Sequence, residues 1–164
     1  RSSKELKTSV NNIKSLVLGG HGDSMVAMVN HTEVNGKKLR DIVNSGNLSQ
    51  VKLDNIIDRT KKGGAEIVKF LEKGSAFYAP ASSGIEMAES YLKDLRKQLP
   101  CAAYLNGEYG VKDIYAGVPV IIGKNGVEKV IELELDKLEK DNFLKSIESV
   151  KELFTAAKKI DQNL

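Results

Sequence analysis

The chain has 164 residues with 25 Lys or Arg and 22 Asp or Glu, which leaves a formal net charge of +3 with histidine neutral. This length suits one domain with one sizeable core, and 41% hydrophobic with 29% charged residues argues against disordered and fibrous classes. One cysteine cannot form an internal disulfide, and no apolar run approaches the length of about 18 residues that a membrane span needs. The balanced charge, without a basic stripe interleaved with aromatics, gives no support for nucleic-acid binding.

The chain begins at Arg1, and the residues that follow it have neither the length nor the apolar content of a signal or transit peptide. We therefore expect the chain to be a cleaved or partial piece of a larger protein. A single cysteine suits a reducing compartment, so the expected location is cytoplasmic, without membrane association.

Short strands are predicted near the N-terminus. The apolar segment 13–18 ends at Gly19-Gly20, which predicts a buried strand followed by a turn, and a second apolar run covers 25–29. The segment 34–37 carries the Asn-Gly signature of a type I′ hairpin, in which both central residues take positive φ. These strands predict a small antiparallel unit.

Two helices are predicted in the middle of the chain. Apolar residues recur at helical spacing from Leu53 to Leu71, with an interruption at Lys61-Lys62-Gly63-Gly64, which predicts a long helix bent or broken at the glycines. The segment Ser83-Gly84-Ile85-Glu86 has the pattern of a capping box and predicts a helix from there to about Leu99, halted by Pro100.

The last third predicts a strand meander followed by a helix. Strands are expected at 101–105, 118–122 and 127–133, with hairpin-type residues at Lys124-Asn125-Gly126. A second capping box at 136–139 precedes a long amphipathic pattern. The whole chain, 1–164, is thus predicted to be one α+β domain, a twisted antiparallel sheet packed against three main helices.

His21 is the strongest candidate for chemistry, because it lies between two glycines directly after a predicted strand. Flanking glycines let a ligand approach closely, and an imidazole can both give and take a proton near neutral pH. The alternative is a turn histidine bonded to nearby backbone. Asp23 could orient His21, but a carboxylate in such a turn more often caps a local N–H, and we favour that local role.

Other chemistry-bearing residues favour structural roles. His31 lies in a polar approach to the hairpin, and Cys101 heads an apolar strand and is expected to be a small core residue. The two histidines and the cysteine have no metal-ligand spacing. Gly63-Gly64 is no phosphate loop and no Gly-x-Gly-x-x-Gly occurs, so any dinucleotide must bind mainly elsewhere.

A series of segments resembles the lactate/malate dehydrogenase superfamily in the same order. They are Leu18-Gly19-Gly20-His21-Gly22-Asp23-Ser24-Met25, Asp58-Arg59-Thr60 with Ala65-Glu66-Ile67-Val68, Tyr78-Ala79-Pro80-Ala81, Met87-Ala88-Glu89-Ser90-Tyr91-Leu92, Gly107-Glu108-Tyr109-Gly110 and Val118-Pro119-Val120-Ile121-Ile122-Gly123. Together they cover nearly the whole chain and end in a long C-terminal helix like that of the superfamily.

The resemblance implies the C-terminal, substrate-binding half of a two-domain NAD-dependent enzyme, with the N-terminal Rossmann half absent from this sequence. His21 matches the histidine that protonates the carbonyl oxygen of a 2-oxo acid as hydride arrives. The superfamily's orienting aspartate, carboxylate-clamping arginine and selectivity loop all precede Arg1. Neither Arg1 nor Asp23 matches these residues.

Three further positions match pocket walls of the superfamily: Gly64 and Ala76 for substrate and Pro80 for the nicotinamide. For each of them plain packing is the alternative. The resemblance is nearest to malate dehydrogenases of the lactate-dehydrogenase-like type, so it implies malate and oxaloacetate as substrates, with lactate as the alternative. It also implies a homodimer or homotetramer that associates through helices including the one from Leu53. A non-catalytic interaction module is the remaining hypothesis.

Overall fold

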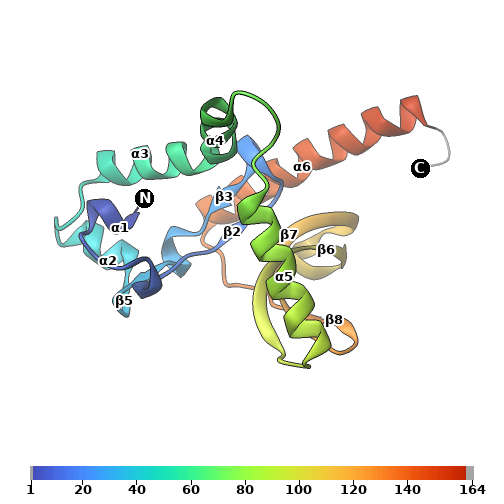
Figure 1. Ribbon diagram of the computed structural model, residues 1–164, viewed down its shortest axis with the longest axis horizontal. Coiled ribbons are helices and arrows are strands. Elements are labelled where there is room, and N and C mark those ends of the chain that lie inside the picture. Colours follow the sequence, from blue (N-terminus) through green and yellow to red (C-terminus); the bar gives the residue numbers. More distant parts are fainter. Residues whose placement is uncertain (1, 162–164) are drawn as a thin grey trace.

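The computed structural model describes residues 2–161, and its elements group around two hydrophobic clusters. In Figure 1, α5 and the β6–β7–β8 sheet lie at one end, α1, α2 and α3 lie at the other, and β2, β3 and the start of α6 lie between them. The helices are α1 Ser2–Glu5, α2 Leu39–Asn44, α3 Gln50–Lys61, α4 Gly63–Leu71, α5 Tyr78–Leu92 and α6 Lys137–Ile160. The strands are β1 Ile13–Lys14, β2 Val17–Leu18, β3 Val26–Ala27, β4 Glu33–Val34, β5 Lys37–Lys38, β6 Lys97–Asn106, β7 Lys112–Gly123 and β8 Gly126–Val130.

The strands form three antiparallel sheets, with orders β1-β4-β5, β2-β3 and β6-β7-β8. This confirms the predicted α+β class and the C-terminal meander. The single buried strand predicted at 13–18 is wrong, because β1 and β2 belong to different sheets and Ser15 and Leu16 between them are in neither. In this segment only Leu18 is buried, so nothing favours one continuous core strand.

The β4–β5 hairpin has the predicted turn. Asn35 and Gly36 have φ of 50° and 74° between paired strands, as a type I′ turn requires. The helix predicted from Leu53 to Leu71 is broken, as expected. Lys62, with φ −82° and ψ 7°, ends α3 and begins α4, so the interruption falls just before the two glycines.

The predicted bounds of the next helix are wrong at both ends. α5 begins at Tyr78, and Ser83 is an exposed residue inside it rather than its cap. Pro80 is tolerated because it lies in the first turn, where a backbone N–H has no helical partner. The helix ends at Leu92, and Pro100 lies within β6, which can accept a proline because it is an edge strand.

The larger hydrophobic cluster lies where the β6–β8 sheet meets β2, β3 and α6. Its fully buried members include Met28, Leu105, Val118, Val120 and Phe143. The smaller cluster joins the β4–β5 hairpin, α2 and α3 through Val34, Leu39, Leu48 and Leu53. None of the helices within 2–161 is long and apolar enough to cross a membrane.

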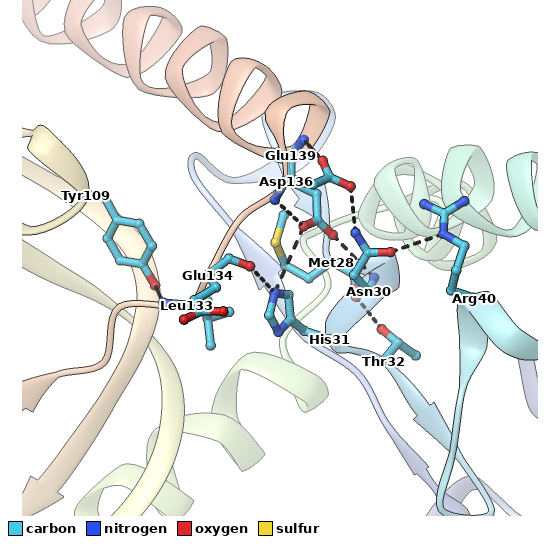
Figure 2. A network of polar contacts seen from close by, with 10 residues as sticks. All are labelled: Met28, Asn30, His31, Thr32, Arg40, Tyr109, Leu133, Glu134, Asp136 and Glu139. Atoms are coloured by element: carbon cyan, nitrogen blue, oxygen red, sulfur yellow. Dashed lines mark hydrogen bonds and ion pairs between the residues drawn. The ribbon is translucent and has the colours of Figure 1, made fainter.

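The start of α6 carries the predicted capping box (Figure 2). Asp136 Oδ1 accepts from Glu139 N at 2.8 Å, Glu139 Oε2 accepts from Asp136 N at 3.3 Å, and the Glu139 N–H lowers the pKa of Asp136. The turn after β3 is tied to this cap, because Asn30 N donates to Glu139 Oε1 and Asn30 Nδ2 to Asp136 Oδ2. His31 Nε2 lies 3.0 Å from the Glu134 carbonyl oxygen, so His31 joins the same turn to the segment before α6.

Ser90 offers a test of how α5 is held on the sheet. Its side chain is fully buried, donates to Ile122 O at 2.7 Å and accepts from Lys97 N at 3.2 Å. Ser90→Ala in the intact protein should lower the free energy of unfolding by about 1–3 kcal/mol, because the buried partners of Ser90 lose their hydrogen bonds. Urea unfolding followed by circular dichroism measures this.

The matched control is Ser83→Ala on the same helix. Because Ser83 is exposed and interior to α5, its replacement should change stability by less than about 0.5 kcal/mol. A Ser83→Ala loss comparable to that of a helix N-cap, about 1 kcal/mol, would contradict the observed start of α5.

Candidate active site

The loop that carries His21 begins at a close contact between β2 and β7. Gly19 and Gly117 form an isolated antiparallel bridge, with Gly19 N to Gly117 O at 2.9 Å and Gly117 N to Gly19 O at 2.8 Å. A Cβ on Gly117 would lie 2.8 Å from Gly19 O, and one on Gly19, whose φ is +89°, would overlap Ser146 Oγ. Two glycines are therefore required for the backbones to approach this closely.

The same loop is also tied to α6. Gly20 N donates to Ser146 Oγ at 2.8 Å, and Ser24 Oγ donates to His21 O at 3.4 Å. Ser146 itself is buried. The backbone just before His21 is thus held by β7 and α6, and the Ser24 hydroxyl braces the loop after it, which places the histidine on a supported loop.

The His21 side chain is exposed and unpartnered. It precedes the 3₁₀ turn Gly22–Ser24 with extended backbone angles, and its imidazole makes no hydrogen bond with any residue from 2 to 161. The turn-histidine alternative requires such a bond to nearby backbone. An imidazole held by its backbone alone keeps both ring nitrogens available to a ligand.

The favoured role of Asp23 as a local cap is wrong. In the described part of the chain, the Asp23 carboxylate accepts no backbone N–H and forms no hydrogen bond or ion pair with His21. Its charge acts instead on Lys62, whose pKa is raised chiefly by a hydrogen bond to Asp58 and to a smaller extent by Asp23.

His21 faces a hollow of about 430 Å³ that also contains Gly64 and Ala76. Gly64 comes from the first turn of α4 and Ala76 from the segment before α5, so three segments far apart in sequence meet here. Pro80 is not among the lining residues and is exposed on the first turn of α5. The other lining residues are Gly22, Asp23, Met25, Thr60, Lys61, Lys62, Ala65, Val68 and Ser75.

The electrostatics of the hollow favour an anion. Lys61 and Lys62 line it at the break between α3 and α4, and Asp23 is the acidic residue in its lining. The α4 N-terminus also lies here without a side-chain cap, and the exposed N–H groups of a first helical turn carry partial positive charge. The sequence analysis did not single out Lys61 or Thr60 as site residues, although Lys61 is part of the predicted break and Thr60 directly precedes it.

The remaining predicted residues lie away from the hollow. Cys101 is half-buried in β6 with Sγ 3.3 Å from Met87 Sδ, and burial raises the pKa of its thiol, which agrees with an inert core residue. His31 belongs to the α6 cap network in Figure 2. Across residues 2–161, no group of three or more His, Cys, Asp or Glu side chains is arranged to hold a metal ion.

Comparison with known proteins identifies the family. The profile of the lactate/malate dehydrogenase, alpha/beta C-terminal domain, matches residues 2–160. The chain belongs to the lactate/malate dehydrogenase family. Among curated members, the malate dehydrogenase of Pelagibacter ubique is 59% identical over 99% of the chain, and that of Caulobacter vibrioides is 57% identical over 95%.

Solved structures of the family have the same fold. Malate dehydrogenase from Cryptosporidium parvum superposes with a TM-score of 0.92 at 42% identity, over 96% of this chain and 50% of that one. Lactate dehydrogenase from Eimeria maxima, solved with NADH and oxamate, has a TM-score of 0.92 at 39% identity, over 98% of this chain and 49% of that one. The chain spans about half the length of these relatives, 51% and 49% of the two curated ones, so the N-terminal half of the family's proteins is absent from it.

The bridge between Gly19 and Gly117 leads to a prediction for the loop of His21. Gly117→Ala in the intact protein should lower the free energy of unfolding by about 1–3 kcal/mol, because a Cβ 2.8 Å from Gly19 O forces β2 away from β7. Thermal unfolding followed by circular dichroism measures this loss.

Gly84→Ala is the matched control. Gly84 lies inside α5, and a Cβ there meets nothing within 4 Å. Alanine should therefore stabilise the helix by up to about 1 kcal/mol. Equal behaviour of the two variants would show that the bridge does not need glycine.

Proposed function

We propose that the chain is the substrate-binding half of an NAD-dependent oxidoreductase that interconverts malate and oxaloacetate, with His21 as its acid and base. The observation that carries this is the unpartnered imidazole of His21 facing a hollow lined by Gly64 and Ala76. Relatives that match nearly the whole chain at 57–59% identity are named malate dehydrogenase.

The residues present suit one end of a nicotinamide cofactor. The hollow is lined partly by small residues and has no Gly-rich phosphate loop, so this chain can meet the reactive end of a dinucleotide but not its phosphates. NAD, when bound, supplies or accepts the hydride. We also propose Pro80 as a cofactor contact, reached from the exposed first turn of α5, since it lies outside the hollow itself.

His21 moves the proton in this scheme. As hydride adds to the carbonyl carbon of oxaloacetate, the C=O bond becomes a C–O single bond, and protonated His21 donates its proton to the oxygen. In the reverse direction, neutral His21 accepts the hydroxyl proton of malate as the hydride leaves. Gly64 and Ala76 have little side chain, and this leaves room for the substrate beside the imidazole.

Lactate is the second candidate substrate. The Eimeria maxima lactate dehydrogenase matches this fold with a TM-score of 0.92, equal to that of the Cryptosporidium parvum malate dehydrogenase, so the fold does not discriminate. Rates of the intact protein with oxaloacetate and with pyruvate at equal concentrations would decide between the two. No activity with either would leave the non-catalytic module as the function of the chain.

His21→Asn tests the mechanism in the intact protein. Asparagine is similar in size and donates a hydrogen bond but cannot exchange a proton, so kcat should fall by about 100- to 10,000-fold. The affinity for NADH, measured by its fluorescence on titration, should stay within a few-fold, because the phosphates bind outside this chain.

The pH dependence gives an independent readout. Reduction takes up a proton through His21 and oxidation releases one, so the two rates should depend on pH in opposite directions in the wild type, and both dependences should vanish in the Asn variant. Retention of more than a tenth of wild-type turnover, or unchanged pH profiles, would mean that His21 is a structural turn residue.

We further propose that the intact protein is a homodimer or homotetramer. The α3 helix expected to take part has Leu53, Ile56 and Ile57 in the smaller hydrophobic cluster and exposes Val51, whereas larger exposed apolar side chains lie on α4 and α5. These are Phe70, Tyr78, Ile85 and Leu92, each at least 69% exposed. Analytical ultracentrifugation should give at least twice the monomer mass at micromolar concentration. A monomer at every concentration would refute this.

A further inference from the structure

Three cationic side chains, those of Arg59, Lys61 and Lys62, lie close together at the end of α3. Two of them, Arg59 and Lys62, form ion pairs. Arg59 Nη2 lies 2.6 Å from Glu66 Oε1, and Lys62 Nζ donates to Asp58 Oδ2 at 3.0 Å. Hydrogen bonds to these carboxylates raise the pKa of both Arg59 and Lys62. Their charges are therefore largely neutralised by residues of α3 and α4.

Lys61 differs from these two neighbours. Throughout residues 2–161 it has no hydrogen bond and no ion pair, although it is half-buried. It lines the hollow of His21 and also a second hollow of about 410 Å³ between α3 and α6. A lysine whose stem is packed at such a boundary can keep its ammonium group in contact with solvent and open to a ligand.

The charges that share the hollow leave Lys61 available to a ligand. Asp23 is the acidic residue of the lining, and within residues 2–161 it forms no ion pair with Lys61. Lys62 in turn is bonded to Asp58. Of the two lysines that line the hollow, Lys61 is the one without an ion pair among the described residues. An anion that binds beside His21 can therefore pair with the Lys61 ammonium group.

We propose that Lys61 is a specificity-determining residue that favours 2-oxo acids carrying a second carboxylate. This rests on the proposed function of His21 and deepens it. When His21 contacts the keto oxygen, the group at the far end of a four-carbon substrate must be accommodated by other residues of the same hollow. A carboxylate there gains from a nearby ammonium group, and a methyl group does not.

The experiment compares two substrates of equal length in the intact protein. Oxaloacetate carries a distal carboxylate where 2-oxobutyrate carries a methyl group. In Lys61→Gln the ratio of kcat/KM for oxaloacetate over that for 2-oxobutyrate should fall about three- to tenfold, mainly through KM for oxaloacetate. Lys61→Arg should restore most of the ratio, because it restores the charge.

Lys69→Gln is the matched control, because Lys69 is an exposed lysine on α4 that does not line the hollow. Its substrate ratio should equal that of the wild type. Added salt should lower the wild-type ratio and leave that of Lys61→Gln nearly unchanged, since screening acts on the charge that the variant lacks.

Two results would overturn the role of Lys61 while leaving His21 untouched. Equal losses of kcat/KM for both substrates in Lys61→Gln would mean that the lysine only supports the fold. Unchanged kcat/KM for both substrates would mean that the distal group does not sense it. A wild-type protein that turns over neither substrate would refute the proposed function and the Lys61 inference with it.

Discussion

The close approach of Gly19 and Gly117 is the constraint on which the site depends. Two backbone hydrogen bonds of 2.8 and 2.9 Å join the end of β2 to the central strand of the β6–β8 sheet. Ser146 of α6 then accepts from the next N–H, that of Gly20. The residue after this pair of anchors is His21, so an exposed imidazole is carried by backbone that is tied to both a sheet and a helix.

The two hydrophobic clusters explain how the hollow is assembled around this anchor. The larger cluster joins the sheet, β2, β3 and α6, and it supports the His21 loop from one side. The smaller cluster positions α3 through Leu53, and the break at Lys62 sets α4 off as a separate helix. The hollow thus lies between the anchored His21 loop and the α3–α4 junction, and it is lined by Lys61 and Lys62 from the junction and by Asp23 from the loop.

The start of α6 is joined to the turn after β3, and through it to α2, by polar contacts rather than by apolar packing. Glu139 is buried, yet both of its carboxylate oxygens accept backbone N–H groups, from Asn30 and from Asp136. A buried carboxylate with such partners is stable, whereas an unpaired one would be costly. Asn30 also accepts from Arg40 Nε at 3.1 Å, which connects the network to α2 (Figure 2).

The sequence alone determined the features that depend on local chemistry. The Asn35-Gly36 turn, the Asp136 capping box and the break before Gly63 follow from residues within a few positions of each other, and the structure confirms all three. The order of motifs also identified the family and the candidate His21. Local rules failed at Ser83 and Pro100, because a serine pattern can lie inside a helix that begins earlier, and a proline fits an edge strand.

Only the tertiary structure decided which residues share the hollow. No local rule relates Gly19 to Gly117, or His21 to Lys61 and Ala76, since these contacts join segments that are 40 or more positions apart. The ion pair of Arg59 with Glu66 likewise depends on how α4 is placed after the break at Lys62, whereas the pair of Lys62 with Asp58 is local to the end of α3. Residue types set what chemistry is possible, and the packing of distant segments sets which of those groups can meet one ligand.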